Sequence, residues 1–212
     1  MIYALIIVIF LILVYYFMIL PNIYNKTIIN GKAVCNDIDK RCYRVSEQYR
    51  ERLQASETLA ILNKFCINFM RKLREKYLFN PSDEKRAAMI RYLLSNYNPE
   101  SIIENVPLDD KNTSYVEEKG KVFGICLRER ITKENNFQDL PTIKFVLIHE
   151  LTHMSCFSYG HGEEFWRKFK TLLRDAVDWG MIEVVDYANK PANYCSLLIN
   201  YNPLLDNKIQ VW

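Results

Sequence analysis

Two histidines four residues apart, His149 and His153, enclose a glutamate within a largely apolar stretch of the chain. The preceding residues, Phe145 to Ile148, are all apolar, and Leu140-Pro141-Thr142 is typical of the start of a helix. Because four residues turn a helix by about 400°, the two imidazoles would project from one face, one turn apart. The pattern therefore predicts a buried helix that carries polar groups on one face.

The same spacing predicts a metal site. Glu150 lies about 100° around the helix from His149, so its carboxylate can reach a metal-bound water and act as a general base. The alternative is a chance pattern on a solvated helix face. All three histidines of the chain fall between positions 149 and 161, which random placement would almost never produce. Burying unpaired polar groups costs on the order of several kcal/mol, and metal binding would explain why they are tolerated.

Catalytic zinc usually takes three protein ligands and leaves one position open, and His161 is the expected third ligand. Gly160 and Gly162 flank it and permit a tight reversal of the chain. The alternative for His161 is a helix-capping or surface role, in which case an acid would replace it on the metal. The replacement ligands to consider are Glu163, Glu164 and Glu183. The expected cofactor is one catalytic Zn²⁺ ion.

The first twenty residues predict a membrane anchor. From Ile2 to Leu20 there is no charged residue, and as a helix this run would cross the roughly 30 Å of hydrocarbon in a bilayer. The alternative, a cleaved signal peptide, requires a basic n-region and a small-residue cleavage site, whereas this run ends in Pro21-Asn22. Basic residues follow the run and none precedes it, so we expect a single-pass protein with its folded domain on the cytosolic side.

The length of the chain fits one folded domain behind this anchor. We expect an anchor over residues 1–21, an irregular tether over 22–45 and a single α+β domain over 46–212. Apolar residues recur at helical spacing in residues 46–77, 82–97, 140–157 and 163–178. Residues 101–106 and 114–128 are typical of short strands, with a turn at 118–120. The tail beyond Gly180 has no clear pattern.

Charge and cysteine content exclude some classes of protein. The net charge of +3 is small, and basic residues alternate with acidic ones, so composition gives no case for binding nucleic acid. The six cysteines form no C-x-x-C pair. Isolated buried thiols are therefore expected, and Cys35 with Cys42 is the one close pair that could form a disulfide.

Residues 122–173 resemble the WLM family of zinc peptidases, which is related to the SprT-like proteases. The resemblance is carried by Leu127-Arg128-Glu129-Arg130, by the run from Phe145 to His153 and by His161-Gly162-Glu163-Glu164-Phe165-Trp166. It implies a zincin-like minimal metallopeptidase fold, in which helices accompany a small sheet with an active-site strand. It also implies residue roles: His149, His153 and His161 bind zinc, Glu150 is catalytic, and Phe165 and Trp166 pack behind the metal.

The predicted function is hydrolysis of peptide bonds in a protein substrate. The strand from Val122 to Leu127 would hold an extended substrate as an edge strand, and Tyr159 or Tyr187 would stabilise the oxyanion. The best-known relatives cleave proteins crosslinked to DNA, so the resemblance also implies DNA-associated substrates. Similar chains occur in large DNA viruses, which suggests a viral or virion membrane. The alternative from another class is a non-catalytic, membrane-tethered adaptor in which zinc only holds the fold.

Overall fold

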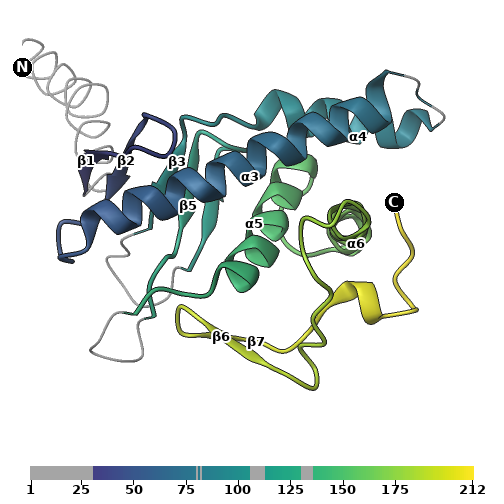
Figure 1. The fold of residues 1–212 in the computed structure, drawn as a ribbon. Helices are drawn as coiled ribbons and strands as arrows, with labels where there is room; N and C mark the ends of the chain where they lie inside the picture. Colours follow the sequence, from purple (N-terminus) through teal and green to yellow (C-terminus); the bar gives the residue numbers. More distant parts are fainter. Residues whose placement is uncertain (1–30, 80, 82, 106–112, 130–135) are drawn as a thin grey trace, which may run out of the picture.

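The computed structural model describes residues 31–79, 81, 83–105, 113–129 and 136–212. It has the mixture of helices and short strands that the sequence predicted (Figure 1). The helices are α3 (Arg52–Leu78), α4 (Glu84–Asn96), α5 (Leu140–Ser155), α6 (Glu163–Asp178) and the short 3-10 helix η2 (Pro203–Leu205). The strands are β1 (Lys32–Cys35), β2 (Cys42–Val45), β3 (Ile102–Glu104), β4 (Tyr115–Glu117), β5 (Val122–Ile125), β6 (Ala192–Tyr194) and β7 (Leu197–Ile199).

The central sheet has the order β3-β5-β4, with β3 parallel and β4 antiparallel to β5. Gly124 in β5 permits close pairing, because a Cβ atom there would lie 2.5 Å from the ring of Tyr115 in β4. The prediction that Val122–Leu127 is an edge strand is wrong, since β5 pairs on both sides. The edge strand that contacts α5 is β4.

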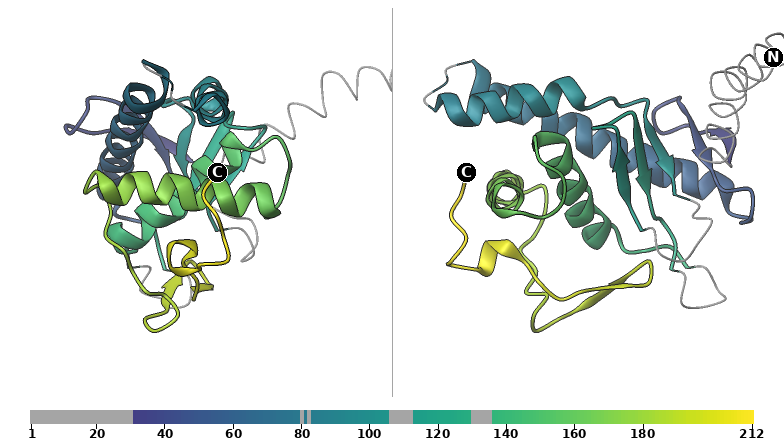
Figure 2. Two further views of the ribbon diagram at one scale, coloured as in Figure 1. Left: turned by 90° about the vertical axis from the view of Figure 1, so that its right-hand side faces the viewer. Right: turned by 180° about the vertical axis from the view of Figure 1, so that it is seen from behind.

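Helix α3 crosses the sheet (Figure 2). It buries one apolar side, which includes Leu59, Phe69 and Leu73. It begins at Arg52 rather than at the predicted Ser46. The backbone N–H of Ser46 donates to the carboxylate of Glu104 at 2.7 Å, which ties this part of the chain to β3 before the helix starts.

Helix α5 is capped by Asp139, whose carboxylate accepts from the backbone N–H of Thr142 at 2.8 Å. Pro141 lies in its first turn, where the missing N–H costs nothing. The helix packs against α4, α6 and β4 and is buried over most of its surface. It lies between α4 at the top and the β6–β7 hairpin at the bottom of both Figure 1 and the rear view in Figure 2. The predicted helix is thus at the centre of the domain.

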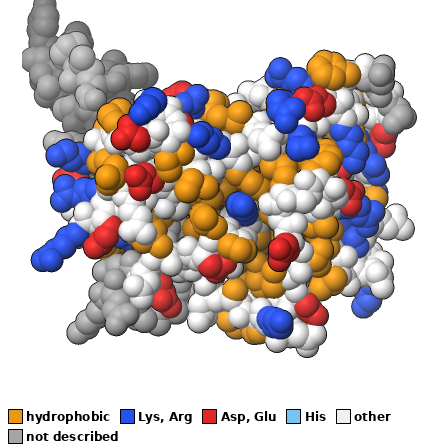
Figure 3. Space-filling model, in the orientation of Figure 1, with side chains coloured by type: hydrophobic (Ala, Val, Ile, Leu, Met, Phe, Trp, Pro, Cys, Tyr) orange, Lys and Arg blue, Asp and Glu red, His pale blue; other side chains and the backbone are white. Residues whose placement is uncertain are grey.

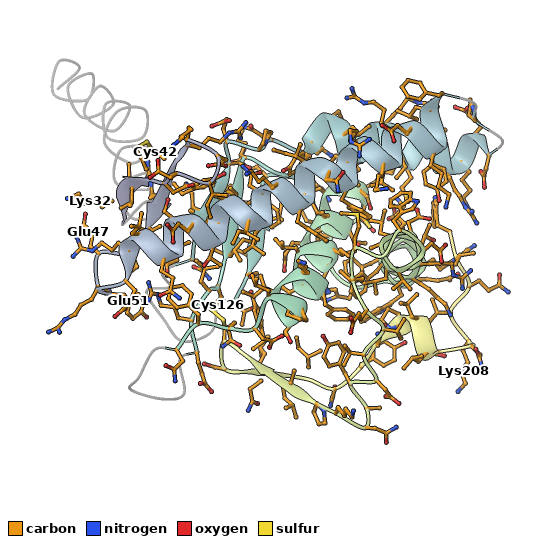
Figure 4. The ribbon with its side chains drawn as sticks, viewed as in Figure 1. Lys32, Cys42, Glu47, Glu51, Cys126 and Lys208 are labelled. Carbon is orange, nitrogen blue, oxygen red and sulfur yellow. A yellow bond between two sulfur atoms is a disulfide. The ribbon has the colours of Figure 1, made fainter. Side chains whose placement is uncertain are left out.

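The expected tether, residues 22–45, contains the antiparallel pair β1 and β2, which contacts α3 and β3. Cys35 and Cys42 pair across it and form a disulfide, so the close pair singled out in the sequence is bridged. A second disulfide, Cys126–Cys195, joins the end of β5 to the β6–β7 turn across 69 residues (Figure 4). The sequence did not predict this bridge, and the expectation of isolated thiols holds for Cys66 and Cys156.

The predicted membrane-spanning helix requires a correction, and with it the single-pass localisation. No helix in the described parts of the chain is both long and apolar enough to cross a bilayer. Helix α3 has the length, but it carries Lys and Arg residues along its exposed side, and the apolar α5 has only 16 residues. The run predicted to span, residues 2–20, lies outside the described residues.

Candidate metal centre

The structure brings the three predicted metal ligands together. The Nε2 atom of His153 lies 3.3 Å from that of His149 and 3.1 Å from that of His161. The Nε2 atoms of His149 and His161 are 3.0 Å apart. Among the described residues, these three histidines are the one group of His, Cys, Asp or Glu side chains arranged to share a metal ion.

The geometry of this group fits one metal ion. A neutral imidazole carries a single N–H, and in the tautomer with the proton on Nδ1 the three Nε2 atoms present lone pairs to one another. In a tetrahedral site with Zn–N bonds of about 2.0–2.1 Å, two ligand nitrogens are about 3.3 Å apart. The observed separations of 3.0 to 3.3 Å are close to that value. A cation shared by the three rings would satisfy all three lone pairs.

Aromatic packing orients the imidazoles. The ring of Phe165 lies 4.8 Å from that of His149, 4.5 Å from that of His153 and 4.6 Å from that of His161, between ring centroids. Phe169 packs edge-on against His149 at 5.2 Å, and Trp166 lies 5.9 Å from His161. The aromatic residues of α6 therefore back the histidines, as the family resemblance implied for Phe165 and Trp166.

The environment keeps the histidines neutral. Burial, together with the neighbouring rings of His153 and His161, lowers the pKa of His149 to about 3. Burial and His161 lower the pKa of His153 to about 4, and burial also lowers the pKa of His161. At neutral pH the imidazoles are therefore unprotonated, which is the form that binds metals.

Glu150 is 6% exposed and lines the same cleft as His149. Within the described part of the chain, its carboxylate has no hydrogen-bonding or ion-pair partner. Burial raises the pKa of Glu150 to about 8. A cation on the neighbouring histidines would favour the ionised form and oppose this effect. The side chain is thus held at the cleft and left free to exchange a proton.

The acids considered as replacement ligands are engaged elsewhere or exposed. The carboxylate of Glu164 accepts from Lys168 Nζ at 2.7 Å and from the hydroxyl and backbone N–H of Ser158. Glu163 is exposed beside Arg167, and Glu183 is exposed in another part of the domain. Gly160 adopts a φ of +81°, in line with the predicted reversal before His161. Through its contacts with Ser158, Glu164 organises the loop that carries His161.

Lys119 supports this loop from the β4–β5 turn. Its Nζ donates to the carbonyl oxygens of Cys156 at 2.7 Å, Ser158 at 3.2 Å and His153 at 3.4 Å. It also lies 4.4 Å from the centre of the Tyr159 ring. These carbonyls end α5 and begin the loop to His161, so one ammonium group donates to several acceptors at the helix end.

We expect Lys119→Met to weaken metal binding by about 10- to 100-fold, the usual cost of removing a group that supports metal ligands. The expected loss of stability is about 1–3 kcal/mol, since hydrogen bonds to a charged group are lost. Competition with a chromogenic chelator and thermal unfolding measure the two effects. The matched control is Lys121→Met, which removes an exposed lysine that pairs with Glu118 on the same turn. Equal affinities for the two variants would contradict the role of Lys119.

The cleft next to the histidines has a volume of about 260 Å³. Besides His149 and Glu150, its walls contain Tyr201, whose hydroxyl donates to Asp206 at 2.8 Å. Tyr159 is 84% exposed and Tyr187 is buried, and neither lines the cleft. The structure therefore brings the predicted ligands together, whereas the sequence analysis missed the tyrosine that lines the cleft. Tyr201 belongs to the tail for which no pattern was found.

Residues 116–192 match the WLM domain family. The matched segment begins in β4, ends at β6 and includes the three histidines and Glu150. Over this segment the chain is similar to WLM domains. The resemblance stated for residues 122–173 is thereby confirmed, and the match extends it at both ends.

Curated relatives of the chain come from viruses and from a yeast. An uncharacterized protein of Acanthamoeba polyphaga mimivirus is 29% identical over 180 residues, covering 83% of this chain and 86% of its own. A protein of invertebrate iridescent virus 6 is 29% identical over 126 residues, covering 58% of this chain and 67% of its own.

The DNA-dependent metalloprotease WSS1 homolog 2 of Schizosaccharomyces pombe is 37% identical over 86 residues. This match covers 39% of the chain but only 27% of the yeast protein, so its activity does not transfer as a whole. No solved structure matches the chain.

Proposed function

We propose that this chain is a zinc-dependent metallopeptidase that hydrolyses peptide bonds in protein substrates. One observation carries the proposal: three imidazole Nε2 atoms meet within 3.0 to 3.3 Å at a cleft that also holds the carboxylate of Glu150, which has no partner among the residues that the structure describes. A metal that only held the fold would need no free carboxylate beside it. The arrangement therefore favours a catalytic site over the adaptor alternative.

In this proposal His149, His153 and His161 would hold one Zn²⁺ ion. Zinc, when bound, lowers the pKa of a coordinated water and polarises the substrate carbonyl. Glu150 accepts a proton from the attacking water and returns it to the leaving amine. The edge strand β4, which contacts α5, would hold an extended substrate by backbone hydrogen bonds.

The experiment is cleavage of casein by the full chain, together with its zinc content. We expect about one zinc ion per chain, loss of cleavage on treatment with 1,10-phenanthroline, and recovery when Zn²⁺ is returned. Circular dichroism before and after chelation follows the fold in the same samples. A protein that never cleaves and only unfolds on chelation would instead be the adaptor with a structural metal.

The substrate class can be narrowed in the same assay. The name of the yeast relative extends our proposal to protein substrates associated with DNA. On the face shown in Figure 3, Lys and Arg side chains are interspersed with Asp and Glu, so no large surface of one sign dominates it. The net charge of the whole chain, +3, is also small. We propose that cleavage proceeds without DNA, and adding duplex DNA to the casein reaction tests this. Cleavage that appears only with DNA would contradict it.

A further inference from the structure

The cleft at the histidines is apolar on three sides. Helix α5 contributes Phe145 and Val146, and α6 contributes Trp166 and Phe169. The third side is the β6–β7 hairpin and the residues that follow it: Tyr194, Leu197, Leu198, Ile199 and Tyr201. The volume of about 260 Å³ is below the roughly 300–1,000 Å³ of pockets for drug-sized ligands. It suits a single large side chain.

The two kinds of wall differ in exposure. Phe145 and Phe169 are 8% and 1% exposed, so they belong to the core. Leu197 and Leu198 are 55% and 58% exposed, although both line the cleft. Single exposed apolar residues are normal on a protein surface, but adjacent leucines beside a candidate active site indicate a binding surface.

The hairpin that presents these leucines is anchored without them. Cys195 in its turn is bonded to Cys126 at the end of β5. The hydroxyl of Tyr194 lies 2.6 Å from Ser114 Oγ and donates to the carbonyl oxygen of Cys126 at 2.9 Å. The wall is therefore formed before any ligand arrives, which lowers the entropic cost of binding.

We infer that this cleft binds a large apolar side chain of the substrate, next to the bond that is cleaved, and that Leu198 is a specificity-determining residue. The inference rests on the proposed function and adds a substrate class to it. Leu, Met and Phe side chains fit the chemistry of the walls, because their burial removes apolar surface on both partners from water. An acidic side chain would lose its hydration there and would face the carboxylate of Glu150.

A peptide side chain is a better occupant than a second folded copy of the chain. The cleft is concave and small, and its apolar walls are continuous with His149 and Glu150. A second copy would need a much larger surface, since stable interfaces bury about 800 Å² on each partner. The cleft adjoins the residues that would act on a bound peptide.

The test uses hexapeptides that differ at one position next to the cleaved bond, which carries Phe, Leu, Ala, Asp or Lys. The full chain should cleave the Phe and Leu peptides with kcat/KM about 10- to 200-fold above the Ala peptide, the range typical of an apolar pocket. Leu198→Asp should erase most of this preference. The matched control is Leu205→Asp, because Leu205 is 49% exposed and does not line the cleft.

Leu198→Ala removes apolar area without adding a charge, so a partial loss of preference in this variant would support the same conclusion. Equal rates for Phe and Ala peptides would overturn the inference and leave the proposed function intact. So would an unchanged preference in Leu198→Asp. A dimer that Leu198→Asp converts to a monomer, with no change in preference, would assign the surface to a second copy.

A binding measurement separates the inference from the proposed function. If no peptide is cleaved, the proposed function fails. Dissociation constants for the uncleaved Phe and Ala peptides then show whether the cleft binds a large apolar side chain. The inference would still be supported if the Phe peptide bound more tightly than the Ala peptide and Leu198→Asp abolished this difference. Equal dissociation constants would overturn it.

Discussion

Glu150→Gln should reduce peptide cleavage by about 10²- to 10⁴-fold, the usual contribution of a general acid–base group. The amide has the same shape as the carboxylate but cannot accept a proton from water. Since Glu150 is buried at the cleft and has no partner among the described residues, its replacement should disturb no ion pair. Zinc content and thermal stability should therefore stay close to those of the unmodified chain.

Glu163→Gln is the matched control for this change. It removes one carboxylate charge close to His161 in sequence, but Glu163 is exposed beside Arg167 and does not line the cleft. We expect casein cleavage by this variant within about twofold of the unmodified protein, because exposed ion pairs contribute little. If Glu150→Gln cleaved casein as fast as Glu163→Gln does, the proposed mechanism would be refuted.

His161→Ala should lower the affinity for zinc by more than about 100-fold, beyond the effect of losing a mere supporting group. It should also abolish cleavage. Its Nε2 atom lies 3.0 and 3.1 Å from those of His149 and His153, so removal leaves two ligands where a catalytic ion needs three. Because His161 lies on an exposed loop, the fold without metal should change little. Titration with a competing chelator measures the affinity, and circular dichroism measures the fold.

Two further variants address the acids that the sequence offered as alternatives. Glu163→Ala and Glu183→Ala should bind zinc as tightly as the unmodified chain, because both side chains are exposed and stand outside the group of three histidines. Tight zinc binding by His161→Ala, together with weak binding by either acid variant, would move the third ligand from His161 to that acid.

The local features of the metal centre could be predicted because they depend on helical spacing. A separation of four residues places His149 and His153 on one helix face whatever surrounds the helix. The bounds of α6 agree with the predicted helix, and α5 begins where Leu140-Pro141 indicated. The hypothesis that His161 joins the pair used the number of histidines and the flanking glycines, and the structure brings the three rings together.

The features that the sequence did not reveal are contacts between distant segments. The Cys126–Cys195 bridge spans 69 residues, and no spacing rule pairs cysteines so far apart. The β6–β7 turn has Cys195 and Ser196 at positive φ, where hairpins usually place Asn or Gly, so the sequence lacked the usual turn signal. The leucine wall of the cleft was missed for the same reason.

What the amino-acid order alone determined is the helix that carries His149, Glu150 and His153, because helical periodicity is a local property of the chain. Tertiary packing decided the rest: that β5 is the centre of its sheet, that Lys119 reaches the end of α5, and that a hairpin from the tail closes the cleft. Each of these depends on which segments meet in space, and periodicity carries no information about that.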